Sequence, residues 1–241
     1  MTGRGTTRGV RRALAASVPL VLTVLVLGTV AGCGTASESS PHAGVDGLVI
    51  PTPSPDPADF GTPGAPVDNP WFPLKVGTRW TYQVTDIDGT HRLEARATDG
   101  PEIAGVPTTA LVRTGSGRSE TDYYAQDDEG NVWWFGREGE WRAGVDGAEA
   151  GIAMLAVPRV GDGYRQAYDE GVVEDTASIV SLDGDVSVEA GSHDHVLQTE
   201  DRSALEVGVT HDRSYARGVG LVEDHVVAGD YRSVRLVSVD Y

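Results

Sequence analysis

Trp80-Thr81-Tyr82-Gln83-Val84, followed by the turn Asp88-Gly89 and the return Leu93-Glu94-Ala95-Arg96-Ala97, decides the fold class. Apolar and polar residues alternate in both arms, which is the period of a β-strand that buries one face. Asp-Gly is a favoured two-residue turn between antiparallel strands. This stretch therefore predicts a β-hairpin near the start of the folded domain.

The same rhythm of short strands and Gly or Asp turns continues to the end of the chain, and no segment keeps a helical period over three turns. Residues 144–171 break the pattern, and within them residues 144–168 predict an irregular segment packed back on the sheet. We predict an antiparallel all-β domain over residues 68–241, built as a curved sheet, an open barrel or a sandwich. The further predicted strands are 103–112, 121–126, 131–135, 177–182, 186–189 (after a turn at Asp183-Gly184), 196–199, 205–211, 221–227 and 234–239.

The N-terminal residues predict an export signal. Residues 1–12 carry four arginines and no acid, and residues 13–31 are almost entirely apolar. Leu27-Gly28-Thr29-Val30-Ala31-Gly32-Cys33 resembles the lipobox of bacterial lipoproteins, and the resemblance implies cleavage before Cys33 and acylation of that cysteine. Several acyl chains hold a protein durably at a membrane. We expect a signal peptide over residues 1–32 and a domain anchored to the cell membrane through Cys33, facing outside the cytoplasm. An uncleaved signal anchor and ordinary secretion are the alternatives.

Residues 33–67 predict a tether between this anchor and the domain. Seven of the thirteen prolines lie between Gly34 and Val67. Proline fixes φ and donates no backbone hydrogen bond, so this composition favours an extended spacer over a sheet strand.

Charge and cysteine content exclude several classes of partner and cross-link. Four of the 19 basic residues and none of the 36 acidic residues precede Cys33, so the chain from Cys33 onward carries 15 against 36, a net charge of −21. Such an acidic chain repels phosphate backbones, which argues against nucleic acid as a partner. Cys33 is the only cysteine, so a disulfide within the chain is impossible.

Three segments are similar to a group of secreted or lipid-anchored bacterial proteins, many of them actinobacterial, that are described only as hypothetical. The similarity covers most of residues 68–228. It implies a mostly antiparallel β fold outside the cytoplasm, and it implies no activity and no catalytic residues. The segments are Asn69-Pro70-Trp71-Phe72-Pro73-Leu74 with Gly77-Thr78-Arg79-Trp80, Tyr123-Tyr124-Ala125-Gln126-Asp127 with Asn131-Val132-Trp133-Trp134-Phe135-Gly136, and Tyr215-Ala216-Arg217-Gly218-Val219-Gly220-Leu221-Val222.

Motifs of catalysis are missing from the sequence. Ser116 lies between two glycines, but no Gly-x-Ser-x-Gly elbow occurs, and no glycine-rich phosphate loop precedes a predicted helix. We therefore predict no catalytic residue and no cofactor, and expect a non-enzymatic surface lipoprotein that binds a small ligand or an envelope protein.

A metal site is the alternative function. His193 and His195 are two residues apart, so on a regular strand both imidazoles project to one face and could reach one metal ion. His211, on a later predicted strand, could supply a third ligand. Exposed strand or turn histidines are the other interpretation of the same residues.

Aromatic residues offer a second candidate site, for a ligand such as a sugar ring. Trp133 and Trp134 are adjacent on a predicted strand and must face opposite ways, so one indole points away from the core of the sheet. Tyr124 lies on the preceding predicted strand. Residues 144–168 then act either as a plug that buries both indoles or as a lid over an aromatic pocket.

Overall fold

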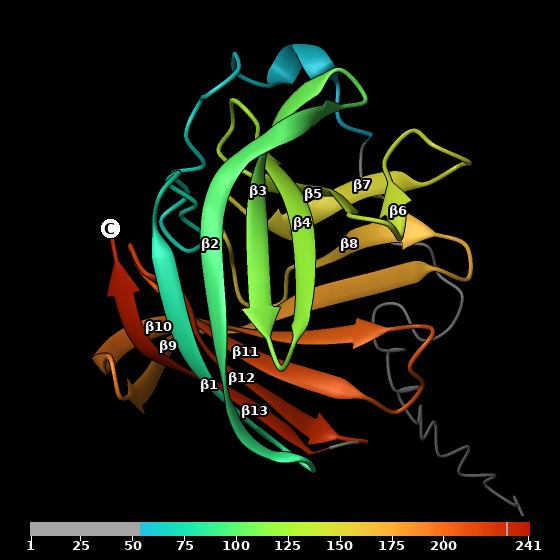
Figure 1. Ribbon diagram of the computed structural model, residues 1–241. Coiled ribbons are helices and arrows are strands. Elements are labelled where there is room, and N and C mark those ends of the chain that lie inside the picture. The colour runs from blue at the N-terminus through green and yellow to red at the C-terminus, as the bar shows by residue number, and fades with distance from the viewer. Residues whose placement is uncertain (1–53, 230) are drawn as a thin grey trace, which may run out of the picture. The chain divides into compact units, whose positions relative to one another are not determined.

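The computed structural model describes residues 54–229 and 231–241, which fold as one antiparallel β-structure (Figure 1). One short 3₁₀ helix, η1 (Pro57–Asp59), precedes the strands. None of the helices in this part of the chain is long and apolar enough to cross a membrane. The strands are β1 (Arg79–Asp86), β2 (Gly89–Ile103), β3 (Val106–Gly115), β4 (Arg118–Gln126), β5 (Val132–Arg137), β6 (Trp141–Arg142), β7 (Glu149–Met154), β8 (Gly163–Asp169), β9 (Val173–Val188), β10 (Gly191–Ser203), β11 (Thr210–Ala216), β12 (Gly220–Ala228) and β13 (Arg232–Asp240).

The sheet closes on itself. Its strand order is β4-β3-β2-β1-β13-β12-β11-β10-β9-β8-β7-β5-β6, and β4 also pairs with β5. Twelve strands therefore form a ring, and the two-residue β6 is attached to β5 outside it. The predicted antiparallel all-β class is confirmed, and the architecture is a closed barrel.

The hairpin predicted from the alternation around Trp80 and Leu93 is present as β1 and β2. Trp80 pairs with Ala95 and Tyr82 with Leu93, and these side chains face the barrel interior. Alternation thus identified the inner face of both strands correctly.

The prediction of an irregular segment over residues 144–168 is wrong, because β7 and β8 lie there and complete the ring. Five of the six residues of β7 are buried. A strand that is buried on both faces shows no alternation of polar and apolar residues, so its sequence carries no strand period. Gly151 allows the two strands to pack closely, since a Cβ atom there would lie 2.5 Å from the Arg165 carbonyl oxygen.

Two predicted boundaries in the C-terminal half are also wrong. Asp183 and Gly184 lie inside β9, whose turn to β10 comes only after Val188. A Cβ atom on Gly184 would lie 2.7 Å from the Gln198 side chain, so this glycine permits a close strand approach instead of a turn. Residues 205–209 form a loop, and β11 begins at Thr210.

The two ends of the barrel differ. One end carries the β2–β3, β4–β5 and β11–β12 turns and is covered by the segment before β1, seen at the top of Figure 1. Asn69 holds this segment, because its side-chain amide donates to the carbonyl oxygens of Gly130 (2.9 Å) and Leu155 (3.1 Å). The Gly218 amide donates to the Pro70 carbonyl at 2.7 Å. We call this the closed end, and the end with the β1–β2, β3–β4 and β12–β13 turns the open end.

Part of the predicted tether packs on the barrel. Phe60 forms an isolated bridge with Asp127 and lies edge-on against Trp133 and Phe135. Val67 is buried and pairs with Leu74. The contacts of the barrel therefore begin before residue 68, because bridges and ring contacts need no continuous strand hydrogen bonding. The tether up to residue 53, the signal peptide over residues 1–32 and Cys33 lie outside the described residues.

Candidate functional site in the barrel interior

The barrel encloses a cavity of about 890 Å³. Small-molecule sites commonly occupy about 300–1,000 Å³, and barrels of more than about eight strands have room for a ligand beside their inward side chains. At the closed end the cavity ends against Phe72 and Leu74. At the other end it reaches exposed turn residues such as Ser116, Arg118 and Leu205, so it opens there.

The first charged group in the cavity is the β3–β5 cluster, made of Arg113, Glu120, Asp122 and Arg137. Asp122 Oδ2 lies 2.6 Å from Arg113 Nη1, and its Oδ1 lies 2.8 Å from Arg137 Nε. Glu120 contacts both guanidinium groups. The strand register builds this cluster, because Arg113 is paired with Glu120 and Asp122 with Arg137. Burial opposes the charge on Arg113, but Asp122, Tyr124 and Glu120 together outweigh this effect and raise the pKa of the guanidinium.

The second charged group is the β10–β12 cluster, made of Asp201, His211, Arg213 and Asp224. Arg213 lies 2.6 Å from Asp201 Oδ2 through Nη1 and 3.3 Å from Asp224 Oδ2 through Nε. His211 Nδ1 is 2.9 Å from Asp224 Oδ1. Burial opposes ionisation of Asp224, but Arg213 and the hydrogen bond from His211 outweigh it and lower its pKa to about 2. Gln166 donates to Asp201 at 3.0 Å.

The two clusters face the same cavity from different arcs of the wall. The positive charge of Arg213 makes a small lowering contribution to the pKa of Arg113, and the raising contribution of Asp122 is larger. Arg113, Arg137 and Arg213 keep 28%, 25% and 29% of their side chains accessible although they lie inside the barrel. Three guanidinium groups, each held by carboxylates, are therefore presented to the cavity in fixed positions.

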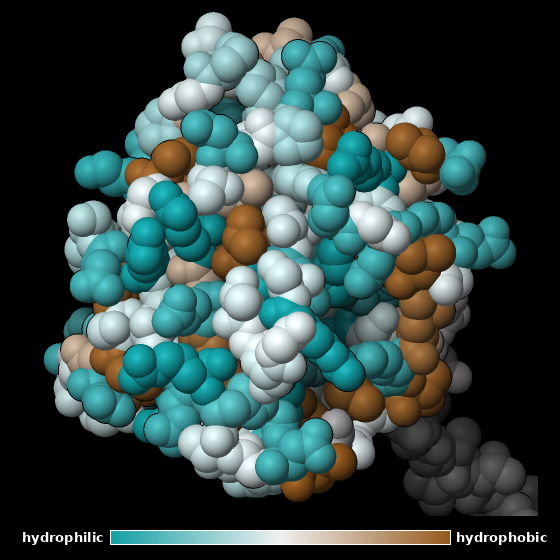
Figure 2. Space-filling view, viewed as in Figure 1, coloured by the Kyte–Doolittle hydropathy of each residue, from teal (hydrophilic) through white to brown (hydrophobic). Residues whose placement is uncertain are grey.

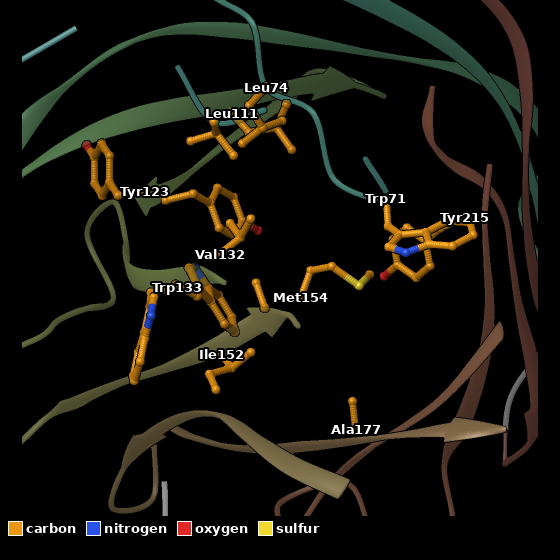
Figure 3. Close-up of a cluster of buried hydrophobic side chains, with 14 of the residues drawn as sticks. Trp71, Leu74, Leu111, Tyr123, Val132, Trp133, Ile152, Met154, Ala177 and Tyr215 are labelled. Atoms are coloured by element: carbon orange, nitrogen blue, oxygen red, sulfur yellow. The ribbon is translucent and has the colours of Figure 1, made fainter. Parts of the chain in front are cut away.

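Trp133 and Trp134 face opposite ways, as the strand period predicts, and both are buried. Trp134 and Tyr124 line the cavity and stack with their ring centroids 6.5 Å apart, while the Arg137 guanidinium covers the Trp134 ring at 5.2 Å. The Trp133 indole N–H donates to Asp127 Oδ2 at 2.8 Å. Figure 3 shows Trp133 well separated from Trp71 and Tyr215. Phe60, from the segment before β1, packs on Trp133. A role of these rings in ligand binding stays a prediction.

The structure does not gather the three predicted metal-binding histidines. His195 has a left-handed φ of 52°, and the β9–β10 register shifts between His193 and Val196, so the regular alternation that would align His193 with His195 is interrupted. His211 lies instead in the β10–β12 cluster. Within residues 54–229 and 231–241, no group of three or more His, Cys, Asp or Glu side chains could hold a metal ion. Elemental analysis of the purified protein tests the metal alternative.

Apart from His211, which was singled out as a metal ligand, the residues of the two clusters were missed in the sequence. A signal was present: His211, Arg213 and Tyr215 share one strand face, as do Glu120, Asp122 and Tyr124. Charged residues that lie on the same strand face as buried aromatic residues indicate a polar barrel interior. The face of the outer surface shown in Figure 2 is mostly hydrophilic, with apolar residues in separate groups.

Comparison with known proteins adds a distant structural likeness. No protein-family model matches the sequence, and no curated protein matches it. One similar solved structure is a protein from Bacteroides fragilis NCTC 9343 that is provisionally assigned as exported and has a YmcC-like fold, with a TM-score of 0.44 and 15% identity over 71% of this chain and 99% of that chain. Another is a protein from Parabacteroides distasonis ATCC 8503 that is provisionally assigned as a lipoprotein, with a TM-score of 0.40 and 14% identity over 70% of this chain and 98% of that chain. Similarity at this level is distant and assigns no function to the barrel.

Proposed function

We propose that the protein is a membrane-anchored extracytoplasmic lipoprotein whose barrel interior binds a small polar ligand. The anchor is Cys33, supported by the order of basic region, apolar run and small residues in the sequence. The binding site is the cavity between the β3–β5 and β10–β12 clusters. We propose binding and not catalysis, because the sequence has no nucleophile motif.

The observation that carries the proposal is the combination of enclosed volume and accessible charge. A folded protein rarely leaves arginine in its interior unless the charge is paired. Here each guanidinium is paired and still keeps about a quarter of its side chain accessible to an internal cavity. Paired, rigid donors around an accessible cavity are typical of a preorganised binding site, where little ordering is needed when the ligand binds.

Thiol labelling of the full chain in a Cys33→Ser background tests whether the chamber is accessible. Leu93→Cys places a thiol on the cavity wall, Gln83→Cys places one on the exposed face of the neighbouring strand β1, and Ala97→Cys places one at a fully buried position of β2. We expect a small maleimide to label Leu93→Cys without unfolding and a large polyethylene-glycol maleimide to label only Gln83→Cys. If Leu93→Cys reacts as slowly as Ala97→Cys, the interior is not an accessible chamber and the proposal fails.

A further inference from the structure

We infer that the ligand of this chamber is an uncharged, hydroxyl-rich molecule of the saccharide or polyol class. The inference rests on the proposed function and specifies its ligand. Three features of the cavity wall support it: the balance of charge, the polar groups left without a partner, and the requirement that one ligand both donate and accept hydrogen bonds.

The charges of the two clusters are nearly balanced. The β3–β5 cluster has two arginines and two carboxylates, and the β10–β12 cluster has Arg213, two carboxylates and His211. An anionic ligand would meet carboxylates that already hold the guanidinium groups, in a protein of strong negative charge. A cationic ligand would meet three guanidinium groups. Neither sign of charge finds an unpaired partner of the opposite sign in these clusters.

Several neutral polar groups on the wall have no partner among the described residues. The indole N–H of Trp141 is buried without a hydrogen bond, and this side chain lines the cavity. The side chains of Tyr124 and Tyr215 also line the cavity. No hydrogen bond joins either tyrosine hydroxyl group to another described residue. Burial raises the pKa of both tyrosines, so the two hydroxyl groups stay protonated and can donate as well as accept.

Two other aromatic side chains of the wall, in contrast, have hydrogen-bonded polar groups. The Trp80 indole donates to the Val219 carbonyl oxygen at 2.8 Å, and the Tyr82 hydroxyl donates to the Leu221 carbonyl oxygen at 3.1 Å. Their polar groups are used to hold the closed end together. Leaving a buried donor unpaired costs about 1–3 kcal/mol, and the Trp141 indole N–H is such a donor in a side chain of the cavity wall.

The mixture of wall groups selects hydroxyl groups. Guanidinium and indole N–H groups can donate further hydrogen bonds to acceptors, whereas the oxygens of Glu120 and Asp224 can accept further hydrogen bonds from donors. A hydroxyl group does both, while a carboxylate or phosphate cannot donate to the acids and an ammonium cannot accept from the arginines. A bare alkyl chain would satisfy none of these groups and would strip them of water.

Ligand-observed NMR with the full chain tests the class. The neutral probes are glucose, galactose, mannose and their disaccharides. Glucuronate and glucosamine carry the same ring with an acid or an amine, and decanoate is the apolar control. We expect saturation transfer to at least one neutral sugar, with binding about tenfold weaker or worse for its charged counterpart and none for decanoate.

Conservative variants locate the binding in the cavity. Tyr124→Phe, Tyr215→Phe and Trp141→Phe each remove one polar group and keep a ring, and each is expected to weaken binding of the neutral sugar by about threefold to tenfold. Tyr123→Phe is the matched control, because Tyr123 is the neighbour of Tyr124 on β4 and does not line the cavity. We expect it to leave binding unchanged.

The outcomes separate this inference from the proposed function. If glucuronate, glucosamine or decanoate binds in preference to every neutral sugar and Tyr124→Phe weakens it, the chamber exists and the ligand class is wrong. If no neutral sugar binds although the thiol of Leu93→Cys is labelled, the class is again wrong. If a sugar binds and Tyr123→Phe weakens it as much as Tyr124→Phe, the site is not in the cavity and the inference fails.

Discussion

Asp122 is the side chain on which the β3–β5 cluster depends, and Asp122→Asn is the sharpest test of the polar interior. The residue is fully buried and lies within 2.8 Å of two guanidinium groups. The asparagine keeps its shape and removes its charge, so Arg113 would keep only Glu120 as a carboxylate partner and Arg137 would keep Glu120 and the more distant Glu140. Removing one partner of a buried ion pair typically costs about 3–5 kcal/mol. Because both arginines are about a quarter accessible, water in the cavity relieves part of this, and we expect a loss of about 2–3 kcal/mol.

Urea unfolding followed by tryptophan fluorescence measures this loss. With an m-value of about 2 kcal/mol/M, the midpoint should fall by about 1–1.5 M. Glu120→Gln is the matched control, since Glu120 contacts the same two arginines but keeps 42% of its side chain accessible. It should cost less than about 1 kcal/mol. A cost of Asp122→Asn no greater than that of Glu120→Gln would refute the claim that a buried carboxylate organises this wall.

Four further outcomes are expected. The lowered pKa of Asp224 gives stability that is present above the ordinary carboxyl pKa near 4 and is lost as the pH falls towards 2; Asp224→Asn should cost about 2 kcal/mol at pH 7 in urea unfolding, and an unchanged acid transition in this variant would contradict the assignment. Burial raises the pKa of Asp175, so the stability contributed by its protonated form is lost as the pH rises through the folded-state pKa. Asp175→Asn should therefore raise the melting temperature of the protein at pH 7, and this gain should vanish in acid. A lower melting temperature of the variant at pH 7 would contradict the raised pKa. Trp133→Ala and Trp134→Ala should each cost about 3 kcal/mol or more, because both indoles are buried; a near-neutral change at either position, with loss of ligand binding, would restore that indole as part of a site. Mass spectrometry of the native protein should find a mature chain that begins at acylated Cys33, and a soluble product or one that retains residues 1–32 would exclude the anchor.

The strand period of the sequence was sufficient for the fold class. Alternation identified the inner faces of β1 and β2, and a two-residue turn joins them as predicted, although it lies at Ile87 and Asp88, one residue before the predicted Asp88-Gly89. It also required Trp133 and Trp134 to face opposite ways, which they do. These features depend only on neighbours along the chain, because successive side chains of a strand point to opposite faces whatever the strand pairs with.

Closure of the barrel and the composition of its interior depend on pairings between distant residues. β1 pairs with β13, joining Trp80 to Val239, and β4 pairs with β5 to complete the ring. No local pattern specifies such a pairing. The strand β7 was missed for a related reason, since burial on both faces removes the alternation that marks a strand.

The candidate site itself was decided by tertiary structure. The sequence drew attention to His193 and His195, but a bulge in β10 interrupts the alternation that would align them. The interior ion pairs form between residues that the register places opposite each other, as with Asp122 and Arg137. From sequence alone, an isolated charged residue is most simply interpreted as a solvent-exposed one. Only closure of the sheet turns one face inward, and it is this closure that converts such charges into the wall of a chamber.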